Sequence, residues 1–366
     1  MRILQIGMTD NLGGIENYLM NYYRNINKEK IQFDFVNIYQ NNLCFQEEIE
    51  SLGGKVYKVS SYYKHPLKYI NELKKIIKDN NYEIVHCNMN SAVMLYPLIA
   101  AKLVHTKVII AHSHNASSDK GLLKSILHSI NKHFIPLFAN TYFACSKKAG
   151  EWFYSKKILN SDKFYVINNA ININDFKFDS FVRSEMRNNL KIGKDEIVLC
   201  HVGRFNKQKN HEFLIKAFKE IQQKNSKTKL MLIGIGPLLE QTKELAKKLR
   251  LENDVIFLGQ RNDVYKLMCS ADIFVLPSLY EGLPLVGVEA QASGLKCYIS
   301  NNVTKEVQLL NETEFLPLEI DKWSDIANCS ININRNKCLS LCESFDIHVC
   351  AETLAILYKK LGENNE

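Results

Sequence analysis

Short runs of apolar residues alternate with amphipathic helical patterns along the whole of this 366-residue sequence. Such alternation is typical of βαβ units, in which helices cover the faces of a parallel sheet. We expect strands at 2–8, 33–39, 55–60, 84–88, 107–113 and 141–146 in the first half, and at 197–203, 229–234, 255–259, 273–278 and 296–300 in the second. The sequence therefore predicts an α/β fold built on doubly wound parallel sheets.

The length of the chain indicates two domains, since single cores rarely grow beyond about 250 to 300 residues. An asparagine-rich stretch at 164–176 separates the two sets of expected strands and is interpreted as a linker. We expect an N-terminal domain at 1–172, a C-terminal domain at 173–345, and a helix at 346–366 that packs back on the N-terminal domain. The two Rossmann-like domains are expected to face each other across a cleft.

We expect neither a secretory signal nor a membrane-spanning helix in this sequence. The longest apolar run, 92–101, contains a proline and is shorter than the roughly 20 residues that a spanning helix needs. The ten cysteines form no CxxC pair, so the spacing indicates neither a paired zinc site nor a disulfide framework. Cys338, Cys342 and Cys350 could form a metal site, although buried thiols on C-terminal helices fit better. We expect a reducing, cytoplasmic location and no bound metal.

The net charge of +8 is unevenly distributed. Residues 1–172 carry 21 Lys and Arg against 13 Asp and Glu, whereas residues 173–366 carry 26 of each. The whole excess of positive charge therefore lies in the first half, which favours an anionic partner there. Nucleic acid is not expected, because no aromatic platform is interleaved with the basic residues.

In parallel sheets ligands bind beyond the carboxyl ends of the strands. Gly13 and Gly14 follow the first expected strand and open a helix, where free backbone N–H groups could bind an anion. A flexible turn before a helix is the alternative for two glycines alone. His112 and His114 end the fifth expected strand and share one face of it. They could contact a ligand through hydrogen bonds, serve a structural role, or ligate a metal.

Two cations follow the first strand of the second half. Arg204 and Lys209 flank a polar turn before a helix, where they could bind a diphosphate or remain solvated surface charges. Gly234 and Gly236 form only a partial dinucleotide-binding signature. No acidic residue follows on the next strand, which ends in glutamine and then Arg261, so a dehydrogenase is not favoured.

The stretch LYEGLPLVGVEAQASG, 279–294, places two carboxylates around a helix start. A helix is expected from about residue 284 to 293, with Glu281 in the loop before it and Glu289 inside it. Free N–H groups around Leu283, Pro284 and Leu285 would attract phosphate oxygens. Carboxylates on either side of that site could accept hydrogen bonds from the hydroxyls of a nucleotide sugar.

Taken together, Gly13–Gly14, AHSHN, GR followed by Lys209, FLGQRNDV and EGLPLVGVE resemble the family-4 retaining glycosyltransferases of the GT-B fold. The resemblance covers nearly the whole chain and is most specific in residues 197–300. Seven residues separate Glu281 from Glu289, as in that family's EX7E motif. At 169–172 the chain reads NAIN where NGID is frequent in the family, and no role is assigned to that turn.

The resemblance implies roles for these residues. The C-terminal domain would bind the donor, with Glu289 on the ribose and Glu281 on the transferred sugar. Arg204 and Lys209 would stabilise the leaving diphosphate, so no metal or other cofactor is implied. The remaining donor contacts would be Gly13, Gly14, Arg261, Leu283, Pro284 and Leu285.

The catalytic set implied by the resemblance also includes a histidine of the N-terminal domain. His114 is favoured for that role over His112. The reaction would be retaining transfer of a hexose or N-acetylhexosamine from a nucleotide sugar, with UDP as the expected nucleotide. The acceptor would be a glycan or lipid-linked saccharide of surface polysaccharide, capsule or glycolipid synthesis. A sugar-nucleotide epimerase of the same fold and a non-catalytic sugar-nucleotide binding subunit are the alternatives.

Two segments of the basic half combine an apolar face with several lysines or histidines, namely 64–78 and 120–134. Basic amphipathic helices can lie on anionic membranes, and lipid-linked diphosphate acceptors are themselves anionic. Either segment alone is better explained as an ordinary surface helix packed on a sheet. Together with the charge asymmetry they predict a reversible peripheral association with the cytoplasmic face of an anionic membrane.

Overall fold

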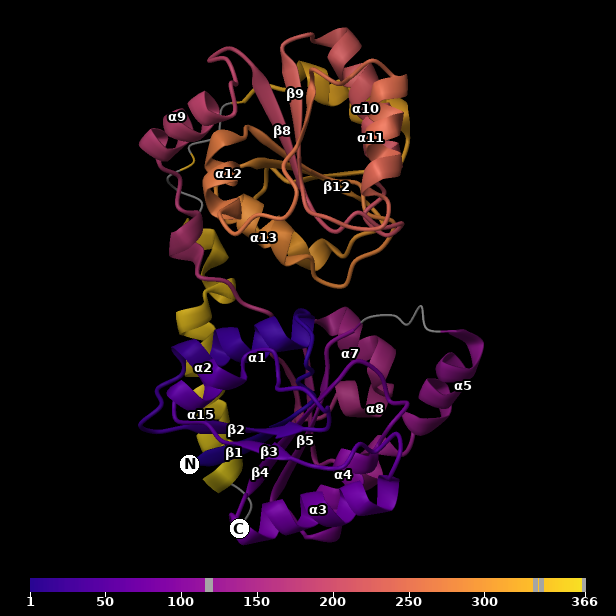
Figure 1. Ribbon diagram of the computed structural model, residues 1–366, viewed down its shortest axis with the longest axis vertical. Helices are drawn as coiled ribbons and strands as arrows, with labels where there is room; N and C mark the ends of the chain where they lie inside the picture. Colours follow the sequence, from indigo (N-terminus) through magenta and orange to yellow (C-terminus); the bar gives the residue numbers. More distant parts are fainter. Residues whose placement is uncertain (116–120, 332–334, 336–338, 364–366) are drawn as a thin grey trace. The chain divides into compact units, whose positions relative to one another are not determined.

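A computed structural model describes residues 1–115, 121–331, 335 and 339–363 of the chain. The chain divides into two compact units, the first formed by residues 1–170 with 347–366 and the second by residues 171–346. Each unit is a parallel sheet with helices on both faces (Figure 1). Of the cysteine cluster considered above, Cys338 lies outside the described residues.

The first unit is an α/β layer structure. Its strands are β1 (Arg2–Ile6), β2 (Gln32–Asn37), β3 (Val56–Lys58), β4 (Ile84–Met89), β5 (Val108–Ser113), β6 (Thr141–Ala144) and β7 (Phe164–Val166). Its helices are α1 (Gly14–Asn25), α2 (Gln46–Ser51), α3 (Pro66–Asp79), α4 (Tyr96–Leu103), α5 (Gly121–Asn131), α6 (Ile135–Phe138), α7 (Lys147–Phe153), α8 (Lys156–Leu159) and α15 (Ile347–Glu363).

The described strands of the first unit pair in the order β3-β2-β1-β4-β5-β6-β7, and every pair is parallel. The central strands β4 and β5 are buried along their whole length, because helices cover both faces of the sheet. The order reverses at β1, whose neighbours are β2 and β4. Parallel sheets bind ligands beyond the strand ends at such a point.

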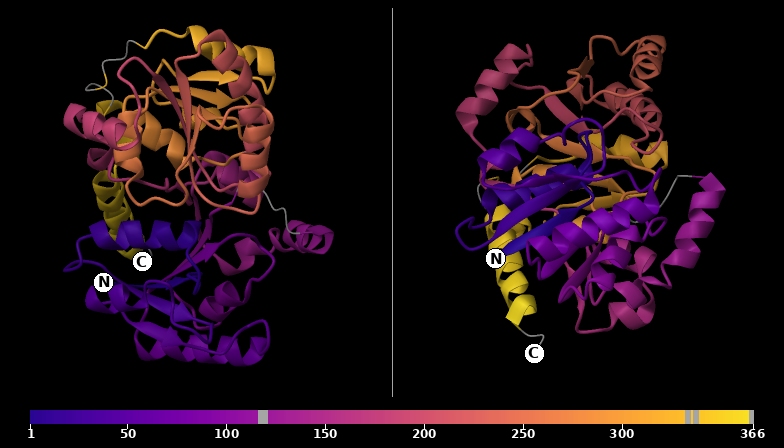
Figure 2. Two further views of the ribbon diagram at one scale, coloured as in Figure 1. Left: turned by 45° about the horizontal axis from the view of Figure 1, so that its top comes forward. Right: turned by 60° about the horizontal axis from the view of Figure 1, so that its bottom comes forward.

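The C-terminal helix α15 belongs to the first unit, and Figure 2 shows it in yellow beside that unit's sheet. Its buried residues Ala351, Leu354 and Tyr358 join the core that α1 forms with β1, β2 and β5. The Tyr358 hydroxyl also hydrogen-bonds Nδ1 of His86 on β4 at 2.6 Å. The helix is thus held by apolar packing and by a buried polar contact.

The second unit repeats the α/β architecture. Its strands are β8 (Ile197–Val202), β9 (Thr228–Ile233), β10 (Val255–Phe257), β11 (Ile273–Leu276), β12 (Lys296–Ser300) and β13 (Glu314–Leu316). Its α-helices are α9 (Ser180–Asn189), α10 (His211–Lys224), α11 (Leu239–Lys248), α12 (Val264–Ser270), α13 (Leu285–Ala292) and α14 (Ile320–Ser324). Its 3₁₀ helices are η1 (Ile173–Phe176), η2 (Lys305–Val307), η3 (Asp325–Asn328) and η5 (Leu339–Phe345).

The described strands of the second unit are also parallel, in the order β10-β9-β8-β11-β12-β13. The order reverses at β8, which lies between β9 and β11, so the loops after β8 and β11 meet at one end of the sheet. The sequence did not predict β7 and β13, which are three-residue strands at the edges of their sheets. The segment interpreted as a linker, 164–176, therefore begins with a strand and continues through η1.

Candidate functional site

A cation and a carboxylate meet at the carboxyl end of the second sheet. Lys209, in the loop after β8, places its Nζ 2.7 Å from Oε1 of Glu281, in the loop after β11. Both side chains are largely buried. The hydroxyl of Ser278 donates to the same carboxylate oxygen at 2.9 Å, and the amide of Gln208 donates to Oε2 at 3.2 Å. Glu281 is therefore held in one orientation by three neighbouring groups.

The backbone of the β8–α10 loop sets the position of Lys209. The side-chain oxygen of Asn206 accepts a hydrogen bond from the backbone N–H of Lys209 at 3.0 Å. Asn210 has a left-handed backbone conformation with a φ of 55°. The aliphatic stem of Lys209 crosses Gly203, where a Cβ would lie only 3.0 Å from the lysine Cδ. The short turn thus directs the lysine across the strand end.

The two glycines considered as a partial dinucleotide signature have a packing role. Gly234 has a φ of +139°, and a Cβ there would lie 2.1 Å from the carbonyl oxygen of Gly203. A Cβ at Gly236 would lie 2.4 Å from the carbonyl oxygen of Phe205. The glycines therefore allow the loop after β9 to approach the loop that carries Arg204 and Lys209.

Glu289 lies inside α13 and is partly buried. Burial raises the pKa of its carboxyl to about 7, against the opposing effect of the positive charge on Lys209. Within the described part of the chain, no hydrogen-bond donor satisfies this carboxylate. Burial deprives this carboxylate of hydrogen bonds from water. Hydrogen bonds from a ligand would replace them, so the carboxylate is well suited to accept them.

Helix α13 begins one residue later than expected, at Leu285, with Pro284 before it in an extended conformation. The N–H groups of the first turn of a helix have no carbonyl partner within that helix. Leu283, Pro284 and Leu285 thus place a helix N-terminus between Glu281 and Glu289 along the chain. The sequence interpretation of this stretch, a helix start with a carboxylate on each side, matches its geometry.

Two cations predicted for the site are not part of this contact network. Arg204 is exposed, and its guanidinium has no partner among the described residues. Arg261 forms two hydrogen bonds with the carboxylate of Asp263, at 2.8 and 2.7 Å. Arg204 is consequently free to reach a ligand, whereas Arg261 already has an anionic partner.

Three of the four residues predicted for the first unit line another pocket, and His112 does not. Gly13, Gly14 and His114 line a pocket of about 330 Å³ together with Asn90 and Asn169. Gly13 precedes the first residue of α1, so this pocket also borders a helix N-terminus. A Cβ at Gly14 would meet no atom within 4 Å, so the glycine leaves open space there.

The two histidines have different surroundings. His112 is fully buried and shares a hydrogen bond of 2.9 Å between its Nδ1 and Nε2 of His86. His114 hydrogen-bonds Oδ1 of Asn88 through Nε2 at 2.9 Å and lines the pocket. Burial lowers the pKa of His114 to about 3, and lowers that of His112 well below its usual value. His114 is therefore a neutral imidazole at the pocket, and the ring of His112 packs against it with the centroids 4.0 Å apart.

Some residues at these sites carried no sequence signal. Ser278 and Gln208 hold Glu281, and only their positions just after β11 and β8 could have indicated this. Asn169, in the NAIN turn to which no role was assigned, lines the first unit's pocket with a buried side-chain oxygen that lacks a hydrogen-bond partner within the described residues.

The described residues contain no group of three or more His, Cys, Asp or Glu side chains arranged to hold a metal ion. Cys342 is buried and Cys350 is partly buried.

The two basic amphipathic helices of the first unit differ in what covers their apolar faces. Helix α3 buries Tyr69, Leu73 and Ile77 in the core, so it is an ordinary surface helix. Helix α5 lies at the periphery of the unit in Figures 1 and 2, and among its residues only His128 is buried. In the described part of the chain, no helix is both long enough and apolar enough to cross a bilayer.

Two parallel α/β units are the architecture of the GT-B fold, and both units match family models of glycosyltransferases. The protein-family model for Glycosyltransferase Family 4 matches residues 12–175, and the family model for Glycosyl transferases group 1 matches residues 182–316. A putative glycosyltransferase, EpsF of Bacillus subtilis (strain 168), is 36% identical over 311 residues, which cover 84% of this chain and 80% of that protein. The chain belongs to the family-4 glycosyltransferases of the GT-B fold.

Other relatives support the same family and fold. The Escherichia coli UDP-Gal:alpha-D-GlcNAc-diphosphoundecaprenol alpha-1,3-galactosyltransferase is 26% identical over 283 residues, covering 75% of this chain and 72% of that protein. The crystal structure of Anabaena Alr3699/HepE in complex with UDP has a TM-score of 0.82 at 18% identity and covers 98% of this chain and all of that one. At 18% identity, the likeness to this crystal structure shows the fold alone.

Proposed function

We propose that this glycosyltransferase moves a hexose or N-acetylhexosamine from a UDP-sugar, with retention at the anomeric carbon, to a lipid-linked saccharide. One observation carries the proposal: Lys209 and Glu281 are paired at 2.7 Å beside a helix start, with the unsatisfied carboxylate of Glu289 inside that helix. A diphosphate with hydroxyl groups on both sides has the chemistry to occupy such an arrangement.

The donor contacts follow from the chemistry of each group. The N-terminus of α13 and the cations of Lys209 and Arg204 would bind the diphosphate. Glu289 would accept hydrogen bonds from the ribose, and Glu281 from the transferred sugar. Arg261 would lie near the base once its pairing with Asp263 rearranges. In the first unit, the imidazole of His114 is neutral, so it can donate or accept a hydrogen bond but does not act as a cationic acid.

The transfer step breaks the bond between the anomeric carbon and the β-phosphate oxygen of the donor. The electron pair of that bond remains on the phosphate, and an oxocarbenium-like sugar forms. The acceptor hydroxyl then attacks from the same face, and its proton passes to the departing phosphate oxygen. Lys209 and Arg204 stabilise the negative charge that develops on the leaving group, which we expect to be the largest catalytic contribution.

The choice of a lipid-linked acceptor is supported by the named activities of two relatives. The Escherichia coli enzyme named above acts on a diphosphoundecaprenol-linked sugar. A Campylobacter jejuni relative, 33% identical over 129 residues, is an N-acetylgalactosaminyltransferase whose named acceptor is likewise a diphospho-undecaprenol saccharide. We therefore place this enzyme in the synthesis of a surface polysaccharide, capsule or glycolipid.

A lipid-linked acceptor requires the enzyme to work at a membrane. The apolar face of α5 supports a reversible association there, since Leu122, Leu123, Ile126 and Ile130 are 80%, 71%, 46% and 52% exposed. The excess positive charge of residues 1–172 would add attraction to anionic lipids. We propose the cytoplasmic face, where UDP-sugars are made available to such enzymes.

The proposal is tested by binding and by transfer with the full chain. A thermal-shift panel of nucleotide sugars, with and without Mg²⁺, should show selective stabilisation by one UDP-sugar. Transfer to a diphosphoundecaprenol-linked sugar, with the anomeric configuration of the product read by NMR, tests retention. A shift with a nicotinamide cofactor but with none of the nucleotide sugars would overturn the assignment. Interconversion of UDP-sugars without any acceptor would instead identify an epimerase, and binding without either reaction a non-catalytic subunit.

A further inference from the structure

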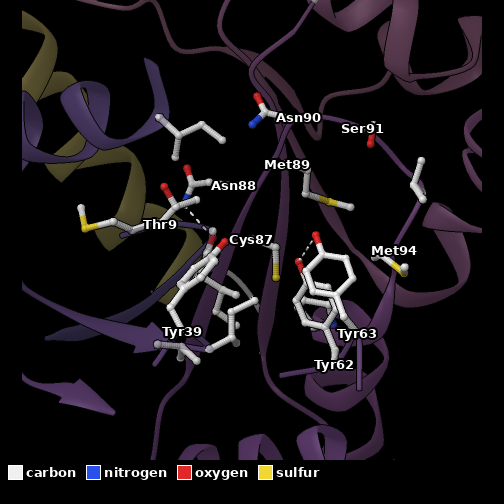
Figure 3. A pocket seen from close by; sticks show the side chains of 18 of the residues that line it. Thr9, Tyr39, Tyr62, Tyr63, Cys87, Asn88, Met89, Asn90, Ser91 and Met94 are labelled. Atoms are coloured by element: carbon white, nitrogen blue, oxygen red, sulfur yellow. Dashed lines mark hydrogen bonds between the residues drawn. The ribbon is translucent and has the colours of Figure 1, made fainter. Parts of the chain in front are cut away.

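A buried amide holds one edge of the His114 ring. Nε2 of His114 lies 2.9 Å from Oδ1 of Asn88, the fifth residue of β4. Asn88 is buried and lines a pocket of about 350 Å³, which Figure 3 shows. His114 lines the other pocket, formed with Gly13 and Gly14 and called here the Gly13–Gly14 pocket. The contact therefore lies between two pockets of the first unit.

The orientation of the Asn88 amide is set by the backbone. Its Nδ2 donates to the carbonyl oxygen of Ile6 at 3.2 Å and to Oε1 of Gln5 at 3.0 Å. A backbone carbonyl can only accept, so the amide nitrogen faces Ile6 and the amide oxygen faces His114. The reverse orientation would bring two oxygens together and would leave buried groups without hydrogen bonds. Asn88 thus presents an acceptor to Nε2 of His114.

The C-terminal helix α15 extends this network. Nε2 of Gln5 donates to the Tyr358 hydroxyl at 3.2 Å, and that hydroxyl donates to Nδ1 of His86 at 2.6 Å. His86 therefore carries its proton on Nε2, which donates to Nδ1 of His112 at 2.9 Å. Beginning from the Ile6 carbonyl, each buried group has one consistent role as donor or acceptor.

A neutral imidazole carries one proton, so the bond to Asn88 decides which nitrogen of His114 has it. His114 is neutral because burial lowers its pKa to about 3. With the proton on Nε2, Nδ1 keeps a lone pair, and it has no hydrogen-bond partner among the described residues. The rings of Tyr18 and His112 pack against His114 with centroids 4.8 and 4.0 Å away, which restricts rotation of the imidazole. His114 therefore offers a ligand an acceptor and not a donor.

An acceptor in the Gly13–Gly14 pocket selects the group that it meets. The lone pair repels phosphate and carboxylate oxygens, which are themselves acceptors, and attracts the proton of a hydroxyl. Among the described residues that line this pocket there is no cation, and the one charged side chain is Glu16. Glu16 lies in the first turn of α1, where its negative charge offsets the attraction of the free N–H groups for an anion. The surroundings of His114 therefore suit an uncharged, hydroxyl-bearing part of a ligand.

From this network we infer that Asn88 is a positioning residue, which fixes the proton of His114 on Nε2 so that Nδ1 accepts a hydrogen bond from a hydroxyl of the transferred sugar. The inference rests on the proposed function, because it takes the ligand to be a nucleotide sugar. It assigns His114 to the sugar and excludes contact between His114 and the leaving diphosphate. A sugar without a proton donor at this point should bind more weakly.

The tautomer of His114 is measured directly by NMR. In the full chain with nitrogen-15-labelled histidines, couplings between ring protons and ring nitrogens show which nitrogen is protonated, and His114→Gln identifies the signals. Wild type at neutral pH should carry the proton on Nε2, and Asn88→Ala should abolish this preference. Asn37→Ala, which replaces another buried asparagine at the end of a strand of the same sheet, should preserve it. A protonated Nδ1 in wild type, or an unchanged tautomer in Asn88→Ala, would overturn the inference.

Binding measurements separate the sugar from the diphosphate. Dissociation constants of UDP and of the UDP-sugar that binds best are measured by calorimetry without an acceptor. His114→Ala and Asn88→Ala should each weaken the UDP-sugar about fivefold, within the usual range for one neutral hydrogen bond, and UDP by less than about twofold. The control Asn37→Ala should change neither constant, and retained UDP binding shows that each variant is folded. Equal losses for UDP and the UDP-sugar would place His114 at the diphosphate and overturn the inference.

Replacing single sugar hydroxyls by fluorine identifies the hydroxyl, since fluorine cannot donate a hydrogen bond. One monofluorinated donor should bind wild type about fivefold more weakly than its parent, and this loss should disappear in His114→Ala. Losses that persist in His114→Ala at every position would refute the hydrogen bond. Sugar transfer by a protein with the proton on Nδ1 would refute the inference and leave the proposed function standing. An Nε2 proton that depends on Asn88, in a protein that binds no nucleotide sugar, would refute the proposed function and leave the positioning role.

Discussion

The ammonium group of Lys209 lies 2.7 Å from the carboxylate of Glu281. The two residues come from loops that follow β8 and β11, which are neighbouring strands separated by a long stretch of sequence. A cation placed in this way does not have to be ordered when a diphosphate arrives, so less of the binding energy is lost to entropy. The carboxylate in turn is fixed where it can accept a hydrogen bond from a sugar.

Removing either cation that we assign to the leaving group should slow turnover strongly. Lys209→Ala and Arg204→Ala are each expected to lower kcat about 100-fold or more, the usual cost of losing one donor to a developing negative charge. Steady-state kinetics with the proposed donor and acceptor measure this. Lys207→Ala, an exposed cation of the same loop, is the control and should lose less than twofold. Losses below threefold for both test variants would contradict the assignment.

The pairing of Lys209 with Glu281 should appear as coupling between substitutions. Glu281→Gln and Lys209→Met are each expected to weaken donor binding, but the double variant should lose less than the sum. Residues in direct contact usually couple by about 0.5 to 3 kcal/mol. A double-mutant cycle on the dissociation constant of the UDP-sugar gives the value, and strict additivity would show that the pair does not act together.

Glu289 should make stability depend on pH. Its pKa is about 7 in the folded protein, above the roughly 4.3 of an unfolded chain, so folding favours the protonated form. The resulting stabilisation is complete below about pH 4 and is lost as the pH rises through 7, by up to about 4 kcal/mol. Between pH 4 and pH 8 the free energy of unfolding of the wild type should therefore fall relative to that of Glu289→Gln, as measured by denaturant unfolding.

The matched control for this experiment is Glu252→Gln, which changes an exposed carboxylate of the same unit. It should show no pH-dependent difference from wild type. A constant difference between wild type and Glu289→Gln across the whole range would contradict the raised pKa. UDP affinity should also increase with pH through 7 in wild type and Glu252→Gln but not in Glu289→Gln, because ribose hydroxyls donate to the ionised carboxylate.

Helix α5 should carry the membrane association and α3 should not. Replacing Ile126 and Ile130 together by serine removes exposed apolar surface that faces away from the unit, so the fold should persist. Cosedimentation with anionic vesicles at low salt should fall at least about tenfold, since each such side chain contributes about 1.5 kcal/mol or more when buried. Leu67→Ser, at an exposed position of α3, should have little effect. Wild-type protein that ignores these vesicles would refute the association.

Gly234 should be required for the shape of the proposed donor site. Gly234→Ala introduces a Cβ 2.1 Å from the Gly203 carbonyl oxygen, so the loop bearing Arg204 and Lys209 has to move. We expect a lower melting temperature and weaker UDP binding. Gly259→Ala is the matched control, because Gly259 also has a positive φ but no atom within 4 Å of the added Cβ. It should lower stability by backbone strain of about 1 kcal/mol and leave UDP binding unchanged. Equal effects on UDP binding would contradict this interpretation.

The parts of the fold that the sequence predicted are those with long, continuous apolar patterns. β4 and β5 are buried on both faces, so their runs of apolar residues were unambiguous. β7 and β13 were not predicted, because each has only three residues, partly exposed at a sheet edge, and these are too few to show a periodic apolar pattern. Likewise, the spacing of Glu281 and Glu289 was visible in the chain, whereas the contacts from Ser278 and Gln208 depend on loops that only folding brings together.

The amino-acid sequence by itself determined the class of fold, the order of its strands along the chain and the residue types available at each strand end, because these depend on local periodicity. Only the tertiary structure decided which of two similar basic helices buries its apolar face. The pattern of α3 and that of α5 both predict an apolar side, but a pattern does not specify what covers it. Packing against α4 and the sheet covers α3, and the neighbours of α5 reach only the side that carries His128.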